Sequence, residues 1–332
     1  MKAWQVNQFC APSEITFAEV PTPGPGEGQV LIRNRAAGVN FFDILQIQGK
    51  YQWKPAFPFT PGAEIAGVIE AVGPGVAELN VTGLSVGDRV LALSMTGGYA
   101  EYSLAPARKT FRIPAAMSFP EAAALPIVYQ TSYYALRHRA RLEWGEWLLV
   151  HAGASGVGMS AIQLGKAMGA NVIATAGSSE KLEFCRQLGA DHVVGYSSED
   201  WVEKVKEITA GGAHVVFDPV GGDVFDLSTK CIAPEGRLLI IGFASGRIPT
   251  VAANRILLKN ISIVGILWGR RAEEQPGYLA QTQAAIFELY NTGKVRPVVS
   301  REYSLADARQ ALEDLARRRV LGKAVLVNGA GF

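Results

Sequence analysis

A glycine-rich turn is the stretch of this sequence best suited to chemistry. The apolar residues 147–151 lead into the turn AGASGVG at 152–158, and a helical pattern begins at Met159. Glycine lets the backbone approach a ligand closely, and the free amides and positive dipole end of a new helix attract anions. Such a turn could hold a pyrophosphate without basic side chains. Four residues are the predicted contacts, namely Gly153, Ser155, Gly156 and Val157.

The spacing of these glycines is weak evidence when taken alone. Gly153-x-x-Gly156-x-Gly158 departs from the common G-x-G-x-x-G and could be an ordinary tight connection. A second apolar strand, Asn171–Ala176, follows at the distance typical of a βαβ unit. This context predicts that the turn binds a dinucleotide.

The end of that second strand indicates which dinucleotide is preferred. Enzymes that use NAD usually carry a carboxylate there for the ribose hydroxyls, whereas this chain has Gly177 and Ser178, with Lys181 soon after. Small polar residues and a lysine suit a 2′-phosphate, so the prediction is NADPH. Two alternatives stay open: Ser178 or Ser179 caps the next helix, and Lys181 is a solvated charge.

Composition excludes several classes of function. The chain has 332 residues, 48% of them hydrophobic, which suffices for two domain cores. The net charge of +2 is spread along the chain, so no nucleic acid partner is expected. Three scattered cysteines suit neither a disulfide framework nor a metal lobe. No apolar run approaches the roughly 18 residues of a membrane span and no signal peptide is evident, so a cytoplasmic protein is expected.

The elements that must position the turn fall into two groups. The first ~110 residues read as short strands separated by Gly and Pro turns, which is typical of a compact barrel. From a helix predicted at Tyr129–Arg141 onward, strands and helices alternate through about Ile266. Two helices and two strands complete the chain. The predicted strands are 1–6, 15–20, 30–36, 63–72, 90–93, 99–104, 192–195, 214–218, 237–241, 261–266, 298–303 and 324–327, and the last helices are 279–291 and 305–318.

Several different short motifs follow one another in a specific order along the chain. They are Gly38-Val39-Asn40-x-x-Asp43, Pro61-Gly62-Ala63-Glu64-x-Ala66-Gly67, Gly87-Asp88-Arg89-Val90, Gly98-Tyr99-Ala100-Glu101-Tyr102, the turn at 152–158, Leu188-Gly189-Ala190-Asp191, Phe217-Asp218-x-Val220-Gly221-Gly222 and Gly322-Lys323. Together they resemble the medium-chain dehydrogenase/reductases, and within them the zinc-less quinone oxidoreductase (zeta-crystallin-like) branch.

This resemblance implies an α/β fold with two domains. Residues 1–125 and 268–332 would form a GroES-like β-barrel that binds substrate. Residues 126–267 would form a Rossmann domain with a doubly wound parallel sheet. The resemblance also implies a homodimer joined through edge strands of the nucleotide domains, with Ile261–Ile266 as the candidate strand.

Departures from the zinc-dependent relatives are equally informative. At the positions of their catalytic zinc ligands this chain has Asn40, Ala63 and Ile127, and the side chains of Ala and Ile cannot bind a metal. The prediction is therefore that no metal takes part. Without a metal to polarise a carbonyl, the hydride acceptor should already be electron-poor, such as a quinone or a double bond conjugated to a carbonyl.

Tyr51 is the candidate proton donor for that reaction. It lies in Ile47-Gln48-Gly49-Lys50-Tyr51, which looks like the Ile-Gln-Gly-x-Tyr segment of mitochondrial enoyl thioester reductases, although quinone reductases carry a similar tyrosine. The alternative is a tyrosine that only packs. Asn40 is a second catalytic and cofactor-binding candidate, while Asn40 and Asp43 could instead cap a turn and a helix.

The remaining cofactor contacts are implied by the resemblance alone. Thr131 would face the carboxamide, whereas Gly177, Lys181 and Tyr196 would face the adenosine phosphate. Phe243 and Leu267 would frame the nicotinamide. Arg318 would reach the 2′-phosphate, unless the three adjacent arginines 317–319 form a solvated helix face.

The leading prediction is an NADPH-dependent, metal-free quinone reductase. The first alternative is a reductase of enones or enoyl thioesters, because small changes of pocket shape decide the substrate. The second, from another class, is a nucleotide-binding protein with little turnover, like the relatives recruited as lens crystallins or RNA binders.

Overall fold

A computed structural model describes residues 1–77, 83–196, 200–275 and 277–329. The chain forms two compact units. Unit 1 comprises Met1–Ile127, Leu279–Phe287 and Pro297–Phe332, and unit 2 comprises Val128–Tyr278 and Glu288–Arg296. The domain limits 1–125 with 268–332, and 126–267, stay a prediction.

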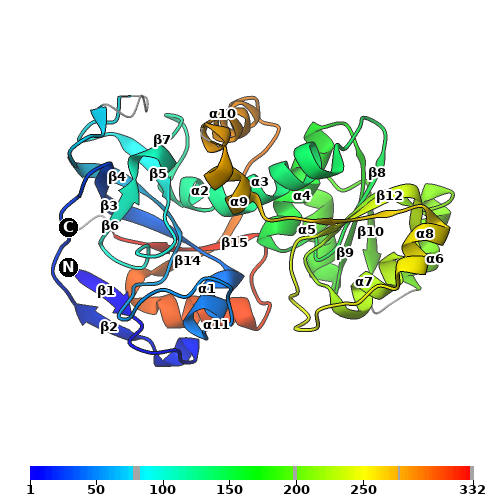
Figure 1. The fold of residues 1–332 in the computed structure, drawn as a ribbon, viewed down its shortest axis with the longest axis horizontal. Coiled ribbons are helices and arrows are strands. Elements are labelled where there is room, and N and C mark those ends of the chain that lie inside the picture. Colours follow the sequence, from blue (N-terminus) through cyan, green and yellow to red (C-terminus); the bar gives the residue numbers. More distant parts are fainter. Residues whose placement is uncertain (78–82, 197–199, 276, 330–332) are drawn as a thin grey trace. The chain divides into compact units, whose positions relative to one another are not determined.

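Unit 2 is built on a parallel β-sheet (Figure 1). Among the described residues it has six strands in the order β10-β9-β8-β11-β12-β13, and every pairing is parallel. Numbered along the chain, this is the order 3-2-1-4-5-6 of a doubly wound dinucleotide-binding fold, which confirms the predicted fold class. The strands are β8 (Trp147–Val150), β9 (Asn171–Ala176), β10 (His192–Gly195), β11 (Ala213–Asp218), β12 (Ile232–Ile240) and β13 (Ser262–Gly265).

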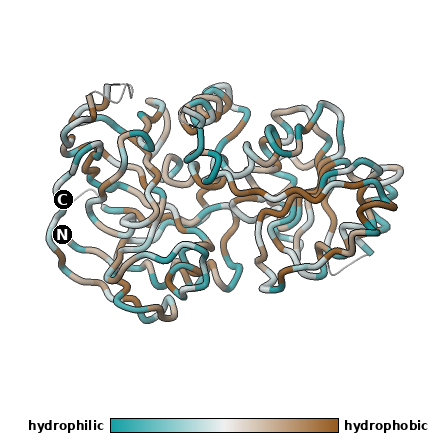
Figure 2. The backbone as a smooth tube through the Cα atoms, in the orientation of Figure 1, coloured by the Kyte–Doolittle hydropathy of each residue, from teal (hydrophilic) through white to brown (hydrophobic). Residues whose placement is uncertain are grey.

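The apolar runs seen in the sequence are the central strands of this sheet. Leu148, Leu149 and Val150 of β8 are fully buried, as expected of a parallel strand covered on both faces. In Figure 2 the hydrophobic colour concentrates along the strands of this sheet. The accompanying helices are α4 (Gly156–Ala167), α5 (Ser179–Gln187), α6 (Trp201–Thr209), α7 (Gly222–Ser228), α8 (Ala253–Lys259) and α9 (Trp268–Glu274).

Unit 1 contains a largely antiparallel sheet made from both ends of the chain. The long strand β3 (Gln29–Val39) pairs with β4 and β6 from the N-terminal part and with β15 from the C-terminal part (Figure 1). The other strands of this sheet are β4 (Glu64–Val72), β5 (Arg89–Leu93), β6 (Tyr102–Pro106), β7 (Thr110–Arg112), β14 (Val299–Ser304) and β15 (Lys323–Val327). A separate antiparallel pair is formed by β1 (Lys2–Gln5) and β2 (Thr16–Glu19). Its helices are α1 (Phe41–Ile47), α2 (Phe119–Ala123) and α11 (Ala308–Ala316), with 3₁₀ turns at Pro12–Glu14, Ala107–Lys109 and Leu305–Asp307.

Several predicted elements differ from the structure in their limits, and the strand expected at 237–241 begins at Ile232. The helix expected at Tyr129–Arg141 is α3 (Pro126–Tyr133) followed by a π-helical segment, Tyr134–Ala140. The strand expected from Tyr99 begins at Tyr102, because the backbone before it bonds elsewhere: Tyr99 N donates to Pro61 O, and Glu101 N donates to Lys2 O. The last long helix is α10 (Tyr278–Asn291). Across the described part of the chain, we find no helix with the length and apolarity needed to cross a membrane.

Candidate functional site

The glycine turn after β8 has the geometry that an anion site requires. Ser155 is the N-cap of α4, and its hydroxyl accepts a hydrogen bond from Gly158 N at 3.1 Å. A Cβ on Gly158 would lie 2.3 Å from Ala152 O, and one on Gly153 would lie 2.7 Å from Cys185 Sγ. Gly158 is therefore required where α4 begins against the turn, and Gly153 is required where the turn packs against α5 and β9. The turn follows the strand beside which the sheet order reverses, which is where ligands bind in such folds.

Tyr196 follows β10, and its side chain lies at this turn. Its hydroxyl accepts from Ala152 N at 3.1 Å and lies 3.2 Å from His151 Nδ1. The predicted contact with the adenosine phosphate stays a prediction.

His151 is the residue at this turn whose importance the sequence did not reveal. It is fully buried, and burial lowers its pKa to about 3, so the ring is neutral. Its nitrogens face Thr175 at 2.9 Å and Ser228 at 2.8 Å, and its ring stacks on Tyr196 and meets the Trp201 ring edge-on. These contacts give His151 a structural role in unit 2.

The end of the second strand carries the residues predicted to select NADPH. Gly177 and Ser178 are exposed, and Lys181 is half-buried in the first turn of α5. Ser178 is the N-cap of that helix and accepts from Lys181 N at 3.4 Å, so the capping alternative for Ser178 is confirmed. A capping hydroxyl at a helix N-terminus remains compatible with an anion nearby.

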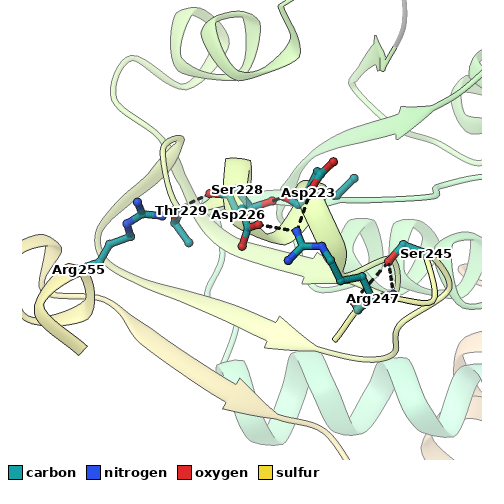
Figure 3. Close-up of polar contacts among 8 residues, drawn as sticks. Asp223, Asp226, Ser228, Thr229, Ser245, Arg247 and Arg255 are labelled. Carbon is teal, nitrogen blue, oxygen red and sulfur yellow. Dashed lines mark hydrogen bonds and ion pairs between the residues drawn. The ribbon is translucent and has the colours of Figure 1, made fainter. Parts of the chain in front are cut away.

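Phe243 lies in the segment that follows β12. Arg247 of the same segment is bonded to residues of α7 (Figure 3). Arg247 ion-pairs with Asp223 at 2.9 Å and with Asp226 at 2.5 Å, and Gly222 N donates to Arg247 O. Phe243 is 38% exposed, which leaves part of its ring free to contact a ligand.

The other predicted cofactor contacts are spread over both units. Thr131 lies on α3, and Leu267 is half-exposed at the N-cap of α9. Arg318 belongs to unit 1, where it follows α11 and is exposed. Their contacts with a dinucleotide stay predictions.

In unit 1, Asn40 and Asp43 lie in a buried polar cluster. Asn40 is at the N-cap position of α1, and its backbone N–H donates to Asp43 Oδ2 at 2.8 Å, so the capping alternative is confirmed for Asp43. The Tyr99 hydroxyl donates to the same oxygen at 2.8 Å. Burial raises the pKa of Asp43 to about 7, although these hydrogen bonds oppose the shift.

A buried ion pair completes this cluster. Lys323 Nζ donates to Glu64 Oε1 at 2.6 Å, to Asn40 Oδ1 at 2.7 Å and to Val39 O at 3.1 Å. Glu64 also accepts from Asn40 Nδ2 at 2.8 Å and from Ile127 N at 2.8 Å. Both ends of the Asn40 amide are thus engaged, which leaves one amide hydrogen for any cofactor or substrate.

Sequence reasoning assigned no role to Glu64 and Lys323. One signal was available, because each is a charged residue inside an apolar strand run, and buried charges are normally paired. Only the tertiary structure shows that these two residues pair with each other, since they are 259 positions apart in the sequence.

Tyr51 follows α1 and is half-buried, with its ring 5.4 Å from that of Phe42. Burial and, to a lesser extent, the Asp43 carboxylate raise the pKa of its hydroxyl. The hydroxyl therefore stays protonated at neutral pH and can donate a hydrogen bond.

The residues of this cluster do not fit a catalytic zinc ion. Ala63 and Ile127 have no ligating side-chain atoms, and Lys323 places an ammonium group against Glu64. Over the described ranges, no group of three His, Cys, Asp or Glu side chains could hold a metal ion.

Two family models match this chain. The model described as "Alcohol dehydrogenase GroES-like domain" matches residues 26–115, and the one described as "Zinc-binding dehydrogenase" matches residues 156–283. A quinone oxidoreductase-like protein 2 homolog of Nematostella vectensis is 40% identical over 309 residues, covering 92% of this chain and 83% of that protein.

Solved structures show the same similarity over the full length. The quinone oxidoreductase of Escherichia coli complexed with NADPH has a TM-score of 0.91 at 31% identity, covering 99% of this chain and 100% of that one. The CurK enoyl reductase has a TM-score of 0.87 at 27% identity, covering 98% of each chain. With these matches and the fold described above, the chain belongs to the medium-chain dehydrogenase/reductase superfamily, among its quinone oxidoreductase-like members.

Proposed function

We propose that this protein is an NADPH-dependent oxidoreductase that reduces quinones without a metal ion. The observation that carries the proposal is the turn at 152–158, where two glycines tolerate no Cβ at the N-terminus of a twelve-residue helix. This geometry suits a pyrophosphate. The named quinone oxidoreductases among the relatives support the substrate class.

The residues of the chain would hold and orient the dinucleotide, which when bound supplies a hydride from the nicotinamide. Backbone amides of the turn, with Gly156 and Val157, bind the pyrophosphate. Lys181 pairs with the 2′-phosphate. Tyr51 donates a proton or hydrogen bond to the oxygen that becomes negative as the acceptor is reduced.

Reduction of enones or enoyl thioesters is the second candidate. The similarity to the CurK enoyl reductase and the protonated, half-buried Tyr51 favour it. An enolate needs a proton donor more than a hydroquinone anion does. A protein that binds NADPH with little turnover is a third candidate.

A substrate panel tests the proposal directly. Steady-state NADPH oxidation is measured with benzoquinone, naphthoquinone, an enone, and crotonyl and acryloyl thioesters, each with and without a chelator. Quinone turnover that is unaffected by chelation is the expected result. Turnover confined to enoyl substrates favours the second candidate, binding without turnover favours the third, and activity lost with a removed zinc ion contradicts the proposal of a metal-free reaction.

Replacing Lys181 by alanine is expected to weaken NADPH binding by roughly tenfold or more and to leave NADH nearly unchanged. A charge-assisted phosphate contact contributes about 1.5 to 3 kcal/mol, and NADH lacks that phosphate. Fluorescence titration with both dinucleotides measures the change. Lys204→Ala, which removes a lysine from an exposed ion pair on α6, is the matched control. Equal losses for the two dinucleotides contradict the assignment of Lys181.

We further propose a homodimer that forms through β13. This strand ends the sheet order within the described residues, and the preceding helix α8 exposes 79% of Leu257 and 80% of Leu258. Exposed apolar groups beside an open sheet edge suit a second copy of the same edge.

Replacing both leucines by aspartate is expected to convert the dimer to a monomer. The two new carboxylates of each subunit would be buried at the interface, close to the two of its partner. Sedimentation velocity measures the mass of the particle. Val86→Asp replaces an exposed apolar residue of unit 1 and should leave the dimer intact. A wild-type monomer, or a dimer that survives the double substitution, contradicts this interface.

A further inference from the structure

Three consecutive backbone amides at the end of β8 find three different partners. His151 N donates to Phe217 O on β11, and Gly153 N donates to Thr175 O on β9. Ala152 N lies between them and donates to the Tyr196 hydroxyl at 3.1 Å. The neighbouring strands thus hold the first and third amides, whereas a side chain holds the middle one.

The hydrogen bond to Ala152 N stabilises an unfavourable backbone conformation. The φ of 48° at Ala152 lies in the left-handed region, which is unfavourable for alanine. Its carbonyl oxygen accepts from Ser155 N at 2.9 Å. The same oxygen fills the space that a Cβ on Gly158 would need. The conformation of Ala152 therefore sets the position at which α4 begins.

The hydrogen bonds around His151 have a defined direction. The Ser228 hydroxyl donates its single hydrogen to Val224 O at 2.6 Å, so it can only accept from His151 Nε2. A buried, neutral imidazole that carries its hydrogen on Nε2 must accept at Nδ1. Nδ1 faces the hydroxyls of Tyr196 and Thr175, at 3.2 and 2.9 Å. A neutral Nδ1 has one lone pair, so it accepts from one of these hydroxyls at a time, and Thr175 is the nearer. The Tyr196 hydroxyl accepts from Ala152 N, and its ring is stacked on that of His151.

We propose that Tyr196, held by His151, is a positioning residue of the dinucleotide-binding turn. It acts by fixing the left-handed conformation of Ala152, and it therefore contributes to the affinity for NADPH and NADH alike. This role differs from the contact with the adenosine phosphate that the family resemblance implies, because a phosphate contact serves NADPH alone. The inference rests on the proposed function, since it supposes that the turn binds a dinucleotide.

Tyr196→Phe tests this role, because it keeps the ring and removes only the hydroxyl. We expect the dissociation constants of NADPH and NADH to rise by the same factor, about fivefold, as for the loss of one hydrogen bond. A rise confined to NADPH would place the hydroxyl on the 2′-phosphate and overturn the proposal. A lower melting temperature with unchanged dissociation constants would overturn it as well, since that is the behaviour of a merely structural residue.

Two further variants cover the case in which Tyr196→Phe does not fold. His151→Leu removes both ring nitrogens and should weaken the binding of NADPH and NADH by the same factor. His151→Gln can still accept from Tyr196 and donate to Ser228, so it should recover most of the affinity. If the wild type, His151→Leu and His151→Gln bind the two dinucleotides with the same affinities, the proposal is contradicted.

The matched control is Tyr303→Phe. Its hydroxyl donates to Asp314 at 2.8 Å in unit 1, and its removal should change neither dissociation constant. A wild-type protein that binds neither dinucleotide contradicts the proposed function itself, and this outcome differs from a loss seen only in the variants.

Discussion

Replacing Lys323 by methionine is expected to lower the free energy of unfolding by about 3 to 5 kcal/mol. The substitution keeps most of the side-chain length and removes the ammonium group that lies 2.6 Å from Glu64. Glu64 is fully buried, so its carboxylate would be left in the interior without a counter-charge. Equilibrium urea denaturation, followed by circular dichroism, measures the change.

Two comparisons separate the ion pair from the loss of a lysine as such. Lys166→Met breaks a half-exposed pair with Asp191 and should cost at most about 1 kcal/mol. Combining Lys323→Met with Glu64→Gln removes both charges and should recover much of the stability, because the uncompensated carboxylate is then gone. A cost for Lys323→Met as small as that for Lys166→Met would refute the energetic importance of the buried pair.

Replacing Tyr51 by phenylalanine is expected to reduce kcat for an enone or enoyl thioester by roughly 100-fold. The change keeps the ring beside Phe42 and removes the protonated hydroxyl. Quinones should lose only a few-fold, because their reduced anions are stabilised internally and can take a proton from water. The measurement is the ratio of wild-type to variant kcat for one quinone and one enoyl substrate.

The affinity for NADPH is determined alongside as the control for this substitution. An unchanged affinity together with a large loss of kcat locates the effect in the reaction itself. If kcat stays at the wild-type value for every substrate that is reduced, Tyr51 has only the packing role. A comparable loss for quinones and enoyl substrates would mean that both depend on the hydroxyl.

Local sequence patterns predicted most of the parallel sheet. Asn171–Ala176 was predicted with the limits that the structure has, since a continuous apolar run bounded by turn residues leaves little choice for a strand buried on both faces. The helix after the glycine turn was expected to begin at Met159, whereas α4 begins at Gly156, because Ser155 is its N-cap. Likewise, apolar periodicity could not separate α3 from the π-helical segment at Tyr134–Ala140, whose side chains show a similar pattern.

By itself, the sequence determined the βαβ unit and the glycine turn, because both depend on residues that are neighbours in the chain. The resemblance to the family then identified Ala63 and Ile127 as positions without ligating side chains. Only the tertiary structure decided which distant polar groups meet. The pairing of Lys323 with Glu64 joins β15 to β4 through their common neighbour β3, and Tyr196 reaches Ala152 from the next-but-one strand of its sheet. The physical reason is that a buried polar group must find a partner, but its identity depends on strand order and register, which bring together residues that no local pattern connects.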